Sequence, residues 1–105
     1  MKIGLAVEAL AALAQESRLA IFRLLVQAGQ EGVAAGVLVE KLGIPPATLS
    51  FHLKNLSHAK LINSRTEGRY VIYSADYNEM NKLIDYLTEH CCAGDSIQCS
   101  SRKPC

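Results

Sequence analysis

Apolar side chains recur at helical spacing through the first quarter of this 105-residue chain. A first amphipathic helix is expected over roughly residues 3–14, on the spacing of Ile3, Val7, Leu10 and Leu13. A polar break at residues 15–17 precedes a second pattern of the same period, which ends at Gly29. So short a connection favours two antiparallel or crossed helices that pack on each other.

The middle of the chain predicts two further helices separated by a tight turn. The third helix is expected over residues 35–42, with Gly43 as its stop. Pro45 and Pro46 open the fourth helix, which runs to about Lys60, because proline is tolerated in a first turn. Its buried stripe is expected to be Leu49, Leu53, Leu56 and the aliphatic stem of Lys60, with Thr48, Phe51, Asn55 and His58 on the opposite side.

The period changes after residue 60. Residues 61–65 and 69–73 are rich in β-branched and aromatic side chains and flank a Thr-Glu-Gly segment, which predicts a β-hairpin with a charged tip. A last helix is expected over residues 77–91, with Met80, Leu83, Ile84, Leu87 and Cys91 on one stripe. The sequence therefore predicts one domain over residues 1–92 and a flexible, cysteine-containing tail over residues 93–105.

Charge is distributed unevenly although the whole chain carries only +1. Residues 46–74 have four basic side chains against Glu67 alone, so this segment is the candidate anion-facing surface. No apolar run approaches the roughly 20 residues that span a bilayer, so membrane insertion is not expected. Glu8 interrupts the apolar start, which is better interpreted as a first helix than as a signal peptide, and we expect a cytoplasmic protein.

The order of elements is typical of a winged helix-turn-helix, a mainly α fold (α+β) with a β-hairpin wing. In that fold the second helix of the pair enters the major groove. Lys54, Arg65 and Arg69 are candidates for phosphate contacts. Candidates for selectivity towards bases are Thr48, Ser50, Phe51 and His52. The alternative for each residue is a structural one, in which the basic side chains only solvate the surface and His52 satisfies a buried carbonyl.

Three stretches resemble the ArsR/SmtB family of metal-sensing repressors. They are residues 49–56 (Leu-Ser-Phe-His-Leu-Lys-Asn-Leu), residues 59–62 with 67–73, and residues 13–21. The resemblance covers residues 5–90 and implies a homodimer formed by the first and last helices. It also implies binding to double-stranded operator DNA with an inverted repeat, and release by an inducing metal.

The sequence departs from two sensor patterns of that family. Arsenic-sensing members carry Cys-Val-Cys on the short helix before the recognition helix, whereas residues 32–38 here contain no thiol. The zinc-sensing pattern on the last helix is not matched either, because His90 stands alone.

All four cysteines lie in the last 15 residues, which does not fit a disulfide framework spread through a secreted fold. Soft thiolates select thiophilic ions, and adjacent cysteines suit a three-coordinate metalloid better than tetrahedral zinc. The arrangement resembles a C-terminal arsenite site of other family members, which implies Cys91, Cys92 and Cys99 as ligands of trivalent arsenic, or of antimonite, with Cys105 as a substitute or bystander.

Other functions remain open at this point. A thiol redox-sensing repressor would use the same cysteines through oxidation instead of metal binding. From other classes, a cysteine-based metal carrier or a thiol oxidoreductase would also be cysteine-rich. The chain lacks a Cys-x-x-Cys in a βαβ setting and a Ser, His and Asp grouping, so an enzyme is not expected.

Overall fold

A computed structural model describes residues 1–94 of the chain. Within that range it contains the helices and strands α1 (Ile3–Leu13), α2 (Glu16–Ala28), β1 (Val33–Ala34), α3 (Ala35–Leu42), α4 (Pro46–His58), β2 (Ile62–Glu67), β3 (Tyr70–Ala75), α5 (Tyr77–Thr88) and a 3₁₀ turn η1 (Cys91–Gly94). The predicted winged helix-turn-helix, α+β with a hairpin wing, is confirmed.

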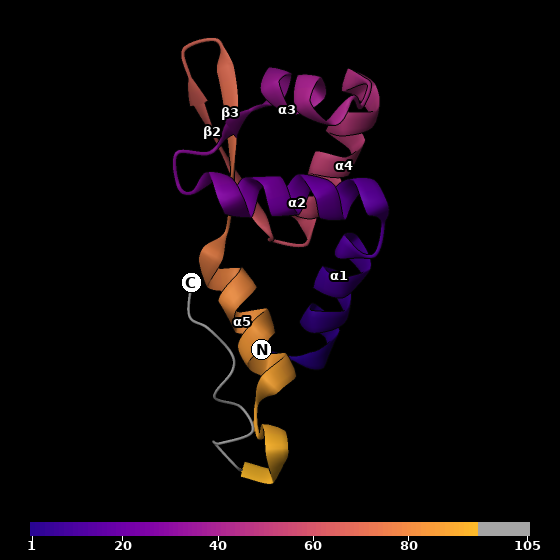
Figure 1. Ribbon diagram of the computed structural model, residues 1–105, viewed down its shortest axis with the longest axis vertical. Coiled ribbons are helices and arrows are strands. Elements are labelled where there is room, and N and C mark those ends of the chain that lie inside the picture. The colour runs from indigo at the N-terminus through magenta and orange to yellow at the C-terminus, as the bar shows by residue number, and fades with distance from the viewer. Residues whose placement is uncertain (95–105) are drawn as a thin grey trace.

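Helix α2 crosses the middle of the molecule and separates two groups of elements (Figure 1). The hairpin and the α3–α4 pair lie on one side of it, and α1 and α5 extend from the other side. Tyr77 at the start of α5 fastens this helix to α2, because its hydroxyl donates to the carbonyl of Val26 at 2.8 Å. That carbonyl is in the last turn of α2, where backbone acceptors have no partner within the helix.

The sheet has three antiparallel strands in the order β1-β3-β2. The two long strands are the predicted hairpin, whereas the two-residue strand β1 was not predicted. It pairs Val33 with Tyr73. Gly32, with a φ of 76°, makes this approach possible, because a Cβ there would collide with the carbonyl oxygen of Tyr73.

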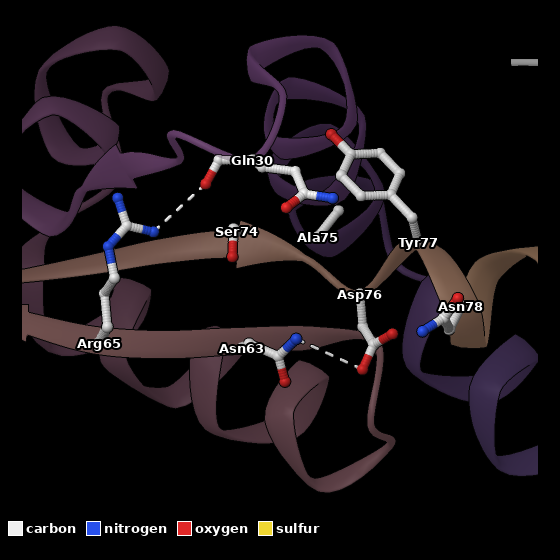
Figure 2. Close-up of a pocket in the computed structure, with 8 residues that line it drawn as sticks. All are labelled: Gln30, Asn63, Arg65, Ser74, Ala75, Asp76, Tyr77 and Asn78. Carbon is white, nitrogen blue, oxygen red and sulfur yellow. Dashed lines mark hydrogen bonds between the residues drawn. The ribbon is translucent and has the colours of Figure 1, made fainter.

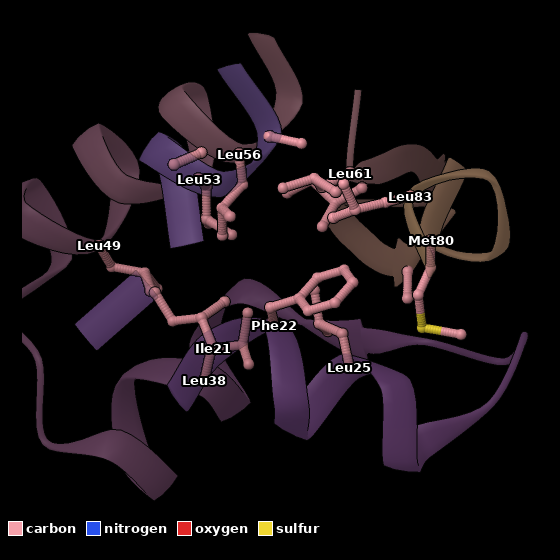
Figure 3. Close-up of a cluster of buried hydrophobic side chains, with 14 of the residues drawn as sticks. Ile21, Phe22, Leu25, Leu38, Leu49, Leu53, Leu56, Leu61, Met80 and Leu83 are labelled. Carbon is pink, nitrogen blue, oxygen red and sulfur yellow. The ribbon is translucent and has the colours of Figure 1, made fainter. Parts of the chain in front are cut away.

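One apolar core lies where α2, α4 and the hairpin base meet (Figure 3). Its fully buried large side chains come from three helices and the α4–β2 link, and are Ile21, Leu25, Leu38, Leu49, Leu56 and Leu61. Met80 and Leu83 dock α5 on this core. No helix of the described residues is long and apolar enough to cross a membrane.

Helix α1 buries only small side chains, Ala6, Ala9 and Ala12. Its larger apolar side chains face outward: Ile3 is 70 %, Val7 57 % and Leu10 42 % exposed. Leu87 on α5, predicted to lie in the buried stripe, is 57 % exposed. An apolar surface of this kind is a mark of a protein–protein interface.

Two predicted helix ends are wrong. Helix α4 ends at His58, because Lys60 takes a left-handed φ of 65° and the N–H of Leu61 bonds back to the carbonyl of Leu56 at 3.1 Å. This is a Schellman-type stop, and it leaves Lys60 exposed instead of packed along its stem. Helix α5 ends at Thr88, so Cys91 does not continue the stripe of Leu87.

Candidate nucleic-acid interface

Helices α3 and α4 form the helix-turn-helix. Gly43 ends α3 in a left-handed conformation and its N–H bonds to the carbonyl of Val39 at 2.9 Å. Pro46 then starts α4 in its first turn, where a missing N–H costs no hydrogen bond. The inward stripe of α4 is buried and consists of Leu49, His52, Leu53 and Leu56.

The opposite side of α4 is open to solvent. Thr48, Ser50, Phe51 and Lys54 are all exposed, and Phe51 is 62 % exposed although it is a large apolar side chain. No salt bridge involves Lys54 within the described residues. A helix of this kind suits a major groove, where polar groups read base edges and an apolar group can contact a thymine methyl.

His52 is placed differently from the prediction. It is 7 % exposed, faces the protein interior, and contacts Arg18 of α2 through its Nδ1 at 3.4 Å. The prediction that His52 meets DNA required an outward side chain and is wrong in that respect. At about 100° per residue, His52 lies within about 60° of both Leu49 and Leu56, so helical spacing would have given the inward placement.

The wing projects from the core as β2 and β3, joined by the two-residue turn Gly68–Arg69. Gly68 has a φ of 62°, which suits the first position of a tight hairpin turn. Arg69 is exposed at this tip, and within residues 1–94 no salt bridge involves it. Its cation is therefore available to an external anion.

Arg65 lies lower on the wing, and its guanidinium is already used. Nε pairs with Glu67 at 2.9 Å, and the two terminal nitrogens donate to the backbone carbonyls of Gln30 and Glu31. Figure 2 shows Arg65 turned toward Gln30 beside a polar hollow of about 330 Å³. The arrangement ties the wing to the α2–β1 loop, so Arg65 has a structural role that the sequence did not indicate.

The structure describes only two of the three predicted metal ligands. Cys91 is half-buried and disulfide-bonded, and Cys92 is exposed with a φ of 58°. Cys99 and Cys105 lie outside the described residues. Within residues 1–94 no three His, Cys, Asp or Glu side chains gather as a metal-ligand set.

Comparison with known proteins and the geometry both identify a helix-turn-helix domain. A family model described as "Helix-turn-helix domain" matches residues 13–65. The arsenical resistance operon repressor of Bacillus subtilis (strain 168) is 37 % identical over 81 residues, which are 77 % of this chain and 73 % of that protein.

Solved structures extend the match to the whole fold. An ArsR-like transcriptional regulator from Rhodococcus sp. RHA1 has a TM-score of 0.77 at 26 % identity, covering 93 % of this chain and 90 % of that one. A homodimeric winged helix-turn-helix DNA-binding domain from Mycobacterium bovis has a TM-score of 0.66 at 25 % identity, covering 84 % of this chain and 82 % of that one. The chain therefore belongs to the ArsR family, whose members are DNA-binding transcription regulators and not a class of enzymes.

Proposed function

We propose that this chain is a homodimeric repressor that binds operator DNA and is released when trivalent arsenic, or antimony, binds Cys91, Cys92 and Cys99. The observation that carries the DNA-binding half is the exposed face of α4, in which Phe51 and Lys54 lie opposite a buried leucine stripe. The arsenic half draws on the cysteine arrangement and on the similarity to an arsenical resistance operon repressor.

The DNA contacts divide by side-chain type. We assign Lys54 and Arg69 to phosphate contacts. A cationic side chain that meets the DNA backbone displaces the counterions bound there, whatever the base sequence. Thr48, Ser50 and Phe51 are assigned to base edges. Arg65 supports the wing, and a phosphate contact would add to that role.

The second subunit is assigned to the outward faces of α1 and α5. Ile3, Val7, Leu10 and Leu87 expose apolar surface that a partner would cover. A twofold arrangement presents two copies of α4 to successive major grooves, about 34 to 36 Å apart. The homodimeric domain from Mycobacterium bovis supports this arrangement.

The chemistry of the donors fits a thiophilic metalloid. Cys91 and Cys92 are neighbours in sequence at the start of η1, separated from the end of α5 by two residues, and a later thiol can complete a three-sulfur set. The ligands must be thiolates, so binding requires Cys91 to be in its reduced form. Binding at the end of α5 is coupled to DNA only if the bound form differs in helix packing or subunit orientation, and a typical coupling changes affinity roughly 5- to 150-fold.

A redox sensor is a second candidate, because the four cysteines in the last 15 residues are chemically suited to oxidation as well as to metalloid binding. Oxidation would then replace the metalloid as the event that alters the end of α5. The two candidates differ in the reagent that releases DNA.

Gel shifts with arsenite or peroxide on wild type and single serine variants test both candidates. Arsenite should release the wild type under reducing conditions, while Cys91→Ser, Cys92→Ser and Cys99→Ser should bind DNA and no longer respond. Cys105→Ser is the matched control and should respond nearly as the wild type does. A normal arsenite response of Cys92→Ser or Cys99→Ser contradicts the three-thiolate site, and release by peroxide alone favours the redox sensor.

A further inference from the structure

Arg18 connects three helices with one side chain. It lies in the first turn of α2, where its backbone N–H is capped by the side-chain oxygen of Gln15 at 2.8 Å. Its Nε donates to the carbonyl of Ala12 at 2.7 Å, and its Nη1 lies 3.4 Å from Nδ1 of His52. The carbonyl belongs to the last turn of α1, whose backbone acceptors lack partners within the helix.

The contact gives the His52 ring an acceptor role. A guanidinium only donates hydrogen bonds, so Nδ1 of His52 is the acceptor in this contact. His52 is buried, and within the described residues the buried side-chain nitrogens and oxygens all have partners. Losing Arg18 would therefore leave a buried ring nitrogen without its partner, which is costly.

His52 is also in contact with the DNA-facing surface. Its ring meets the ring of Phe51 edge-on, with centroids 5.9 Å apart and an angle of 60° between the planes. Aromatic rings prefer such edge-to-face geometry. The exposed Phe51 thus rests against a histidine whose other side is fixed by Arg18.

A surface hollow lies between α1, α2 and α4 beside this pair. It measures about 300 Å³ and is lined by Glu8, Arg18 and His58, among others. Because the hollow removes some side-chain contact between α1 and α4, the polar contacts at its edge contribute more to their relative position.

We infer that Arg18 and His52 form a positioning pair, which transmits the position of α1 to Phe51 on the DNA-facing side of α4. This inference rests on the proposed DNA-binding function and deepens it, because α1 carries the apolar face assigned to the second subunit. A shift of α1 at that interface would move the Ala12 carbonyl, and with it Arg18, His52 and the presentation of Phe51. Neither Arg18 nor His52 needs to touch DNA for this.

The test compares operator and random-sequence DNA for four variants of the full chain. Arg18→Lys keeps the charge but cannot bridge both acceptors, and His52→Leu removes the acceptor. Each should lower operator affinity roughly tenfold, the size of one charge-assisted hydrogen bond. Random-sequence affinity and its salt dependence should not change, because no phosphate contact is lost. His52→Asn places an oxygen near the position of Nδ1 and should restore operator affinity, and Arg23→Lys, an exposed site on the same helix, is the control.

A double variant, Arg18→Lys with His52→Leu, should lose no more operator affinity than either single change, since the two residues act through one contact. Amide hydrogen exchange without DNA should show faster exchange in α4 for Arg18→Lys, with α5 and the sheet unchanged. That measurement separates the inference from the proposed function, because it does not need an operator. The inference would be overturned by additive losses of operator affinity in the double variant, or by equal losses of affinity for operator and random-sequence DNA. Unchanged amide exchange in α4 would also overturn it.

Discussion

Helices α1 and α4 are both amphipathic, but they bury opposite kinds of side chain. Helix α4 buries three leucines and a histidine and turns polar groups and Phe51 outward. Helix α1 buries three alanines and turns Ile3, Val7 and Leu10 outward. Small side chains allow α1 to lie close to its neighbours, while its large ones stay available to another surface. A stripe of large apolar residues therefore marks the core in one helix and a subunit interface in the other.

The same substitution in the two helices should have different effects. Leu56→Ala removes a side chain that is 0 % exposed and should lower the free energy of unfolding by about 2–5 kcal/mol. Leu10→Ala should cost less, and its cost should depend on protein concentration because it acts through the dimer. Urea denaturation at two protein concentrations measures both. Equal, concentration-independent losses would remove the distinction between the two helices.

A charge on the outward face of α1 should separate the subunits. Leu10→Glu would bury a carboxylate against an apolar partner surface, and we expect a monomer by sedimentation at micromolar concentration. Operator affinity should fall about 100-fold or more, since two half-sites are no longer bound together. The control is Ala20→Glu, an exposed position on α2 that should leave the dimer intact. A Leu10→Glu dimer with normal operator binding would contradict the assigned interface.

The outward face of α4 and the wing tip should respond to salt in different ways. Lys54→Ala and Arg69→Ala should each weaken binding to all DNA sequences and reduce the slope of log affinity against log salt by about 1. Phe51→Ala should keep the slope and cost about 1–3 kcal/mol only at particular base pairs. Binding isotherms at several salt concentrations test this, and unchanged slopes for the two basic positions would refute the DNA-facing surface.

The smallest effect is expected where α5 is fastened to α2. Tyr77→Phe removes the hydroxyl that donates to Val26 and should lower the free energy of unfolding by about 1 kcal/mol. Thermal unfolding measures the change, and Tyr70→Phe, at an exposed position on the wing, is the matched control. A loss as large for Tyr70→Phe would show that the hydrogen bond is not responsible.

The sequence predicted the elements that local chemistry determines. Residues 35–42 form α3 as expected, and Pro46 starts α4. It missed β1, because a two-residue strand has no period and depends on Gly32 meeting a strand that follows much later. It extended α5 too far, since no glycine or proline marks the stop and His90 takes its left-handed φ of 58° without one.

The candidate site was predicted less completely, because some of its side chains depend on partners that are distant in sequence. The leucine spacing of α4 fixes which side of that helix is buried. The same spacing therefore predicts that the side chains on its other side are exposed, namely Thr48, Ser50, Phe51 and Lys54. The roles of Arg65 and His52 depend on Gln30, Glu31 and Arg18, which are more than 30 positions away in sequence. Spacing within one helix or strand does not reveal such partners.

The most direct test of the proposed function is an operator titration with and without arsenite, under reducing conditions and at fixed salt. Fluorescence anisotropy of labelled operator DNA would give the affinity in each state. The proposed function predicts tight binding by the dimer and a roughly 5- to 150-fold loss of affinity when arsenite is added. The same affinity in both states, with Cys91 shown to be reduced, would contradict it.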